Sequence, residues 1–171
     1  MFSVAADARN LLGECPIWCE RTRRIYWTDI EGSELLALEE DTSVVMRWSL
    51  PERLGSFALT ENPDVLLMGL ASRFAFCDLN TGTFMPIVAS PGGPGKRTGD
   101  GRCDREGNFV FGTMDDGYPA KVIGRFHRLN AATLSIETLP LPEVAIPNSI
   151  CFSPDGSTMY YCDSMQGRIM C

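Results

Sequence analysis

RIYWTD, at residues 24–29, is a short run of β-forming residues that ends at an acidic residue before a turn. The pattern recurs three more times along the chain, as DVLLMG at 64–69, NFVFGT at 108–113 and TMYYCD at 158–163. Turn signals built on glycine separate the runs, and helical periodicity is almost absent. The sequence therefore predicts an all-β fold built from a repeated unit.

The repeat has a regular length. The central apolar residues of the runs are separated by steps of 40, 44 and 50 residues, at Trp27, Leu67, Phe111 and Tyr161. Each step holds about four short strands; in the first unit these are CPIW, RIYWTD, ELLALEE and SVVMRW. Such a unit is typical of a β-propeller, because a four-stranded sheet has two apolar faces and must stack on its neighbours. We expect a single partial β-propeller domain over residues 1–171, with about four blades.

The composition is that of a soluble globular protein: of 171 residues, 44% are hydrophobic and 22% are charged. The net charge of −7 argues against nucleic acid or an anionic membrane as partner, because either requires a basic surface. The apolar runs are too short to span a bilayer, and residues 1–14 lack the pattern of a signal peptide. The odd number of cysteines, seven, most of them beside apolar residues, favours reduced, buried thiols and a cytoplasmic protein. The oligomeric state stays open.

The first residues of each innermost strand are expected to point into the mouth of the central channel. Glu14 and Asn148 each lie four residues before a matching aromatic residue, so they take equivalent mouth positions. The other two units contribute Gly55 and Gly99 there, with Asp100 beside Gly99. A carboxylate and an amide oxygen suit a hard or borderline divalent cation. The alternative is a set of polar residues that wet a water-filled channel.

Several longer motifs extend this pattern over essentially the whole chain. They are LGECPIW, RIYWTDIEG, RLGSFAL, RTGDGRCDREGNFVFGTM and IPNSICFSPDGSTMYYCDS, in this order. In these motifs the sequence resembles the SMP-30/gluconolactonase/regucalcin-like family. The resemblance implies a six-bladed β-propeller that hydrolyses sugar lactones with one divalent cation in its channel.

The resemblance also implies site residues. Glu14 in LGECP and Asn148 in IPNSI match two ligands of the family's cation, for which Ca²⁺ or Zn²⁺ is expected and Mn²⁺ or Mg²⁺ also suits. The family's third ligand, an Asp in a later P-D-G motif, has no match in this sequence. Neither has the family's general base, so the catalytic residue stays unassigned. Asp155, in a P-D-G turn of different context, is not that ligand.

The expected substrate-binding residues are Arg97, Asp100, Arg53 and Ser56. Arg97 lies in the run RTGDG, where the family usually has an Asn at the position of Gly99. The amide is therefore absent here, and Thr98, Asp100 or a water is expected in its place. Asp115 and Asp116 lie close to the place of a family Glu that contacts substrate.

The implied function is a metal-dependent hydrolase that opens a small-molecule sugar lactone to the aldonic acid. The cation acts as a Lewis acid and activates water. Six blades need about 240–270 residues at about 40–45 per blade, so we expect a truncated copy or fragment. Two alternatives stay open: a non-catalytic calcium- or ligand-binding propeller or inactive fragment, and a phosphotriesterase-like hydrolase. The identity of the lactone is open as well.

Three other polar residues are expected to be structural. His127 alternates along an outer strand, and Asp29 and Asp163 follow matching strands, where they cap turns. A serine hydrolase is disfavoured, because the chain has one histidine and no G-x-S-x-G motif.

Overall fold

The computed structural model describes residues 3–42 and 44–171, and all regular elements in this part of the chain are β-strands. They form four antiparallel sheets in chain order. The first contains β1 (Gly13–Cys19), β2 (Arg24–Asp29), β3 (Glu34–Glu39) and β4 (Val45–Ser49). The second contains β5 (Leu54–Leu59), β6 (Val65–Leu70), β7 (Arg73–Asp78) and β8 (Thr83–Ala89).

The third sheet contains β9 (Lys96–Cys103), β10 (Phe109–Asp115), β11 (Arg125–Leu129) and β12 (Ile136–Thr138). The fourth has three strands: β13 (Pro147–Phe152), β14 (Met159–Asp163) and β15 (Arg168–Met170). The four recurring runs of the sequence are the second strands, β2, β6, β10 and β14. The predicted all-β fold with four blades is confirmed. Ser43, with which the predicted fourth strand of the first unit begins, lies outside the described residues.

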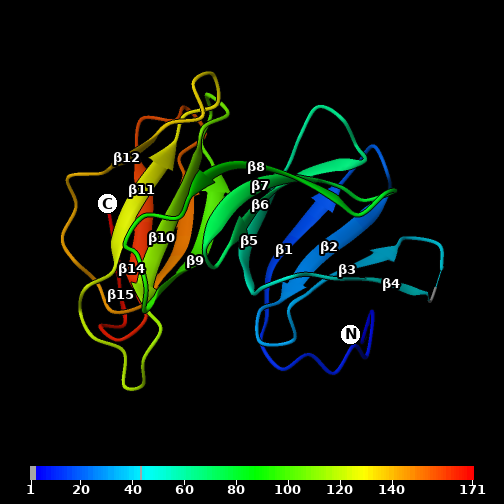
Figure 1. The fold of residues 1–171 in the computed structure, drawn as a ribbon, viewed down its shortest axis with the longest axis horizontal. Coiled ribbons are helices and arrows are strands. Elements are labelled where there is room, and N and C mark those ends of the chain that lie inside the picture. The colour runs from blue at the N-terminus through cyan, green and yellow to red at the C-terminus, as the bar shows by residue number, and fades with distance from the viewer. Residues whose placement is uncertain (1–2, 43) are drawn as a thin grey trace.

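The sheets are arranged as propeller blades around a shared inner edge. The innermost strands β1, β5, β9 and β13 contact one another in that order. In Figure 1 the outer strands β4 and β12 lie on opposite sides of the molecule, and the inner strands lie between them. The channel mouth is therefore built by four segments that are far apart in the sequence.

The hydrophobic core lies between the blades. Tyr26, Phe57 and Met68 belong to a cluster that joins the first two blades, and each is at most 1% exposed. Phe74 and Phe109 join the second blade to the third, with ring centroids 6.2 Å apart. A third cluster joins the last two blades. Each buried aromatic side chain contributes about 1.5–3 kcal/mol, which explains why the blades stack.

The predicted turn caps are confirmed at Asp29 and Asp163. Asp29 accepts hydrogen bonds from the backbone amides of Leu11 and Leu12, both at 2.9 Å, and of Gly32. Asp163 accepts three equivalent backbone bonds. Burial acts to raise the pKa of both carboxyls, but the hydrogen bonds from these donors outweigh burial and lower the pKa of each. Each carboxylate ties the segment before an inner strand to the turn after the second strand.

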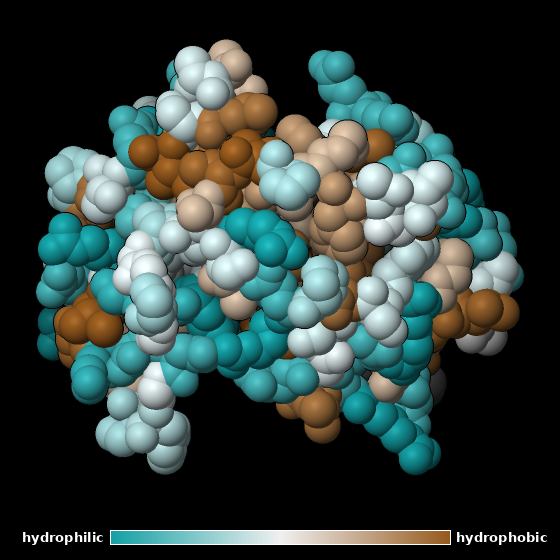
Figure 2. All heavy atoms as spheres, in the orientation of Figure 1, coloured by the Kyte–Doolittle hydropathy of each residue, from teal (hydrophilic) through white to brown (hydrophobic). Residues whose placement is uncertain are grey.

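An apolar groove of about 880 Å³ lies between the second and third blades, at the far ends of their inner strands. Leu59, Leu67, Phe76 and Phe109 contribute to its lining. Figure 2 shows hydrophobic side chains gathered between polar ones at the upper edge of the molecule. None of the predicted site residues lines this groove.

All seven cysteines are free thiols, as the sequence predicts. The expectation that they are buried is wrong for Cys103, Cys151 and Cys171, which are exposed. No helix that could cross a membrane occurs in residues 3–42 and 44–171. The cytoplasmic location stays a prediction.

Candidate functional site

Glu14 and Asn148 take the same position in their blades. Glu14 pairs with Thr28 of β2, and Asn148 pairs with Cys162 of β14. Thr28 and Cys162 each precede the aspartate that caps the turn, and in both inner strands the register shifts immediately after the paired residue. Such a bulge redirects the side chains beside it. The alignment of Glu14 with Asn148 predicted from the sequence is therefore confirmed by register.

The backbone at both bulges adopts a rare conformation. Cys15, after Glu14, has φ 55°, and Ser149, after Asn148, has φ 62°. Residues other than glycine seldom take this left-handed conformation. Its recurrence at two matching positions shows that the inner strands are bent in the same way at the channel mouth.

The mouth contains a cavity of about 220 Å³ that draws on all four inner strands. All five residues that the sequence placed at the mouth line it: Glu14, Gly55, Gly99, Asp100 and Asn148. Arg97, an expected substrate-binding residue, lines it as well. Two expected substrate-binding residues, Arg53 and Ser56, do not line it. The cavity is the place where the two predicted ligands meet two of the four predicted substrate-binding residues, Arg97 and Asp100.

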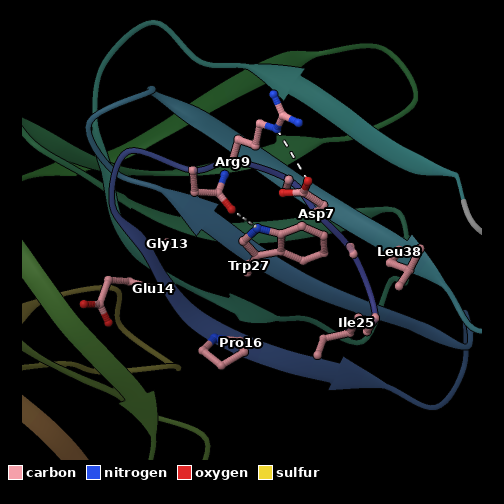
Figure 3. Close-up of a pocket in the computed structure, with 12 residues that line it drawn as sticks. Asp7, Arg9, Gly13, Glu14, Pro16, Ile25, Trp27 and Leu38 are labelled. Atoms are coloured by element: carbon pink, nitrogen blue, oxygen red, sulfur yellow. Dashed lines mark hydrogen bonds and ion pairs between the residues drawn. The ribbon is translucent and has the colours of Figure 1, made fainter. Parts of the chain in front are cut away.

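Glu14 presents its carboxylate to this cavity. Figure 3 shows its side chain turned away from the ring of Trp27. Burial and then the charge of Asp100 raise the pKa of Glu14, while Arg97 opposes them. A cation beside Glu14 would relieve this unfavourable environment of the ionised carboxylate.

Asn148 is held by one hydrogen bond, in which its Nδ2 donates to Ser164 Oγ at 2.8 Å. This bond uses the amide nitrogen and leaves the carbonyl oxygen Oδ1 as an acceptor. Together with the Glu14 carboxylate, it provides two oxygen donors that fit a hard or borderline divalent cation. Among the described residues, no cluster of three or more His, Cys, Asp or Glu side chains accompanies them.

Asp100 joins two blades at the cavity. Its Oδ2 accepts a hydrogen bond from the backbone amide of Ile150 at 2.9 Å, which links β9 to β13. One carboxylate oxygen is therefore committed to the fold. The same bond fixes the position of the carboxylate on the cavity wall.

Arg97 lines the cavity, and its side chain is only 12% exposed. Its Nε lies 3.7 Å from Asp116 Oδ1, and its Nη1 donates to the backbone carbonyl of Thr98. Arg53 donates to the other oxygen of Asp116 and forms an ion pair with Glu31. The structure thus places Arg53 behind Arg97, with Asp116 between them.

Ser56 is fully buried, and its Oγ has no hydrogen-bond partner within the described residues. The structure does not bring it to the cavity with Arg97 and Asp100. The sequence pattern placed it beside Gly55 at the mouth, but adjacent strand residues point to opposite faces.

The sequence indicated the location of Asp116 but not its partners. Its place after the GTM motif marked it only as lying near the site. Its link to Arg53 and Arg97 depends on how two loops meet strand β9, which a single sequence does not reveal.

A second cavity, of about 460 Å³, adjoins Glu14 on the face of the first blade. Its lining includes residues 5–10 and the side chains of Ile25, Trp27 and Leu38. Neither Arg97 nor Asn148 lines this second cavity. The two predicted cation ligands, Glu14 and Asn148, therefore meet in the smaller cavity.

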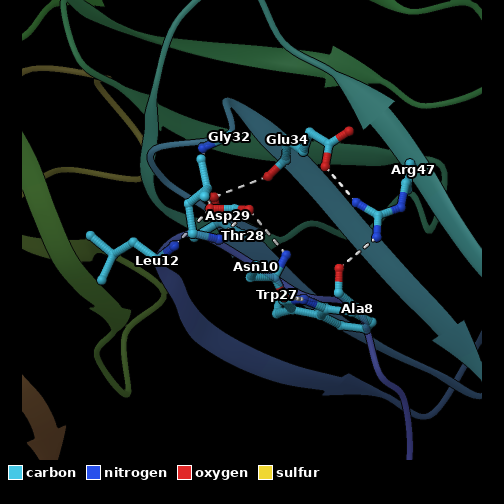
Figure 4. Close-up of polar contacts among 10 residues, drawn as sticks. Ala8, Asn10, Leu12, Trp27, Thr28, Asp29, Gly32, Glu34 and Arg47 are labelled. Atoms are coloured by element: carbon cyan, nitrogen blue, oxygen red, sulfur yellow. Dashed lines mark hydrogen bonds and ion pairs between the residues drawn. The ribbon is translucent and has the colours of Figure 1, made fainter.

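The segment before β1 is anchored over the first blade, as Figure 4 shows. Trp27 Nε1 donates to Asn10 Oδ1 at 2.9 Å, and Asn10 Nδ2 donates to Asp29. Arg47 Nη2 donates to the carbonyl of Ala8 at 2.9 Å. These contacts fix the approach to Gly13 and with it the position of Glu14.

The sequence model of the family described as "SMP-30/Gluconolactonase/LRE-like region" matches residues 12–171. The chain is 53% identical to L-arabinolactonase of Azospirillum brasilense, over 98% of this chain and 56% of the relative. It is 30% identical to 6-deoxy-6-sulfogluconolactonase of Pseudomonas putida, over 91% of this chain and 52% of the relative.

Among solved structures, one neighbour is described as a calcium-binding protein, regucalcin, from Agrobacterium tumefaciens. The two chains superpose with a TM-score of 0.86 at 28% identity, over 94% of this chain and 53% of the neighbour. The chain thus spans about half the length of the relatives and the structure that it matches.

Proposed function

Because this chain belongs to the SMP-30/gluconolactonase/LRE-like family, we propose that it provides the lactone-opening site of a sugar lactonase. The observation that carries the proposal is the cavity that Glu14, Asn148, Arg97 and Asp100 share. The product is the aldonic acid. Residues 1–171 are proposed to form one partial propeller domain.

A lactone is a cyclic ester, and opening it requires a polarised carbonyl and an attacking water. The water oxygen bonds to the carbonyl carbon, the bond from that carbon to the ring oxygen breaks, and the ring oxygen takes a proton. The acid formed loses its proton to solvent at neutral pH. The protein must therefore bind a neutral ring and stabilise negative charge on the carbonyl oxygen.

Glu14 and Asn148 are proposed to hold one divalent cation, with Ca²⁺ or Zn²⁺ expected and Mn²⁺ or Mg²⁺ also compatible with two oxygen donors. When bound, such an ion supplies Lewis acidity and lowers the pKa of water. No described residue is assigned as a third ligand or as the general base.

Arg97 is proposed to donate hydrogen bonds to the hydroxyls of the sugar ring. Its planar guanidinium offers several donors in a fixed geometry, and its low exposure limits the entropy lost when it binds. Asp100 is proposed to accept a hydrogen bond from a hydroxyl on the same wall. Arg53 acts on the site through Asp116.

The proposal is tested by measuring acid release from L-arabinono-1,4-lactone and glucono-1,5-lactone, above the uncatalysed rate, before and after EDTA treatment. L-arabinonolactone comes first because the relative at 53% identity is named L-arabinolactonase. Activity lost with EDTA is expected to return with one of the four cations.

We expect Glu14→Gln and Asn148→Ala each to lower kcat/KM by about a hundredfold, because the first removes the negative charge and one carboxylate oxygen and the second removes the amide oxygen. Glu143→Gln is the matched control, since Glu143 is an exposed carboxylate paired with Arg125 away from the cavity. Full activity in Glu14→Gln would contradict the proposal. Cation binding without turnover would favour a binding propeller, and preference for a phosphotriester would favour a phosphotriesterase.

A further inference from the structure

Asp116 lies between two arginines at the channel mouth. One oxygen of its carboxylate accepts a hydrogen bond from Arg53 Nη2, and the other lies 3.7 Å from Arg97 Nε. The backbone amide of Asp116 donates to the carbonyl of Gly95 at 2.9 Å, which fixes the loop that carries it. The carboxylate thus engages both arginines from a fixed backbone position.

The two guanidinium groups are close enough to influence each other. Burial and then the charge of Arg53 lower the pKa of Arg97, and Asp116 opposes both effects. Glu31 forms an ion pair with Arg53, at 3.4 Å, and its charge also counteracts the lowering of the pKa of Arg97. Without Asp116, Arg97 on the cavity wall and Arg53 behind it would be two adjacent positive groups that Glu31 neutralises only in part.

Two adjacent guanidinium groups form a strong carboxylate-binding site, because each offers paired donors that match the two carboxylate oxygens. The proposed reaction converts a neutral lactone into an anion that carries such a carboxylate. A free arginine pair beside the cavity would therefore retain the product. Asp116 already occupies this site with a carboxylate of the protein itself.

We propose that Asp116 is an internal counter-ion that occupies Arg53 and Arg97 and so makes the cavity favour the neutral lactone over its ring-opened anion. The inference rests on the proposed lactonase function. Asp100 on the same cavity adds negative charge that acts in the same direction. Asp116 is a positioning and specificity residue, since it acts through the two arginines.

The test is calorimetric titration of the full chain with L-arabinonate, and with the neutral, non-hydrolysable L-arabinitol. We expect Asp116→Asn to bind L-arabinonate about fivefold more tightly than the unsubstituted protein, because the arginine pair loses its counter-ion. Binding of L-arabinitol is expected to change less than about twofold. If Asp116 had only a structural role, Asp116→Asn would bind both ligands more weakly than the unsubstituted protein does.

Three further variants test whether the change in affinity comes from the charge of Asp116 and from the two arginines. Asp116→Glu keeps the charge and is expected to retain the original L-arabinonate affinity. Glu143→Gln removes an exposed carboxylate far from the arginine pair and is expected to leave the affinity for both ligands unchanged. Adding Arg53→Gln to Asp116→Asn is expected to reverse the gain, since it removes one of the two guanidinium groups.

L-arabinonate binding that is unchanged, weaker or undetectable in Asp116→Asn would overturn the inference. The outcome is separate from that of the lactonase assay. Absence of turnover in the unsubstituted protein contradicts the proposed function, whereas the calorimetric comparison decides the role of Asp116 without turnover.

Discussion

His127, the one histidine of the sequence, is held in β11 between two threonine hydroxyls. Its Nε2 lies 3.1 Å from Thr113 Oγ1 and its Nδ1 lies 3.1 Å from Thr138 Oγ1. The ring stacks on Phe111 and is 4% exposed. Burial, followed by the charges of Lys96 and Arg125, lowers the pKa of His127 from 6.5 to about 4.

This depressed pKa predicts a pH dependence of stability. Between pH 6.5 and about 4, the unfolded chain takes up a proton that the folded chain does not, so stability falls as the pH falls. From pH 7 to 4.5 the free energy of unfolding is expected to drop by about 2 kcal/mol more in the unsubstituted protein than in His127→Gln.

Urea unfolding of both proteins at the two pH values measures this difference, and the carboxylates common to both cancel. Equal pH dependence of the two proteins would mean that the neutral histidine contributes nothing to acid sensitivity.

Single residues also show where sequence reasoning works and where it stops. Glu14 and Asn148 were placed correctly relative to each other, because their distance from an aromatic of the same strand repeats between units. Ser56 was placed at the mouth by adjacency to Gly55, but the bulge and the alternation of side chains turn it inward. Asp116 depends on loop geometry, which has no periodicity.

At the level of elements, the inner strands approach closely at Gly55 of β5. A Cβ built on Gly55 would lie 2.5 Å from the backbone oxygen of Thr98 in β9. The backbone of β9 is held by its pairing with β10, so it has little freedom to retreat. Gly99 of β9 differs, since its nearest neighbour would lie 3.7 Å away.

We therefore expect Gly55→Ala to destabilise the protein by about 3 kcal/mol, because the added methyl overlaps backbone atoms. Gly99→Ala is the matched control and is expected to stay within about 1 kcal/mol of the unsubstituted protein. Urea unfolding at neutral pH measures both. A Gly55→Ala protein as stable as Gly99→Ala would show that β5 and β9 are not packed this closely.

The strands themselves could be predicted well from the sequence. Short β-forming runs separated by glycine turns predicted all four second strands, and the first blade was predicted strand by strand. The short outer strands β12 and β15, at three residues each, carry too few residues for a pattern to emerge.

At the level of the whole molecule, stacking of the blades is what creates the site. The cavity takes residues from four strands, and Glu14 and Asn148 are separated by most of the sequence. The repeat length predicted this convergence, because equivalent positions of a propeller face one axis. The cavity's charge balance could not be predicted in the same way, since Arg53, Asp116 and Glu31 lie in loops.

A double-variant cycle of cation affinity tests whether Glu14 and Asn148 hold one cation together. Zn²⁺, Ca²⁺, Mn²⁺ and Mg²⁺ are titrated by calorimetry into the unsubstituted chain, Glu14→Gln, Asn148→Ala and the double variant. We expect one cation per chain, with each single substitution weakening binding at least about tenfold and the double variant losing less affinity than the product of the two single losses. Unchanged affinity in both single variants would contradict a shared site at the channel mouth.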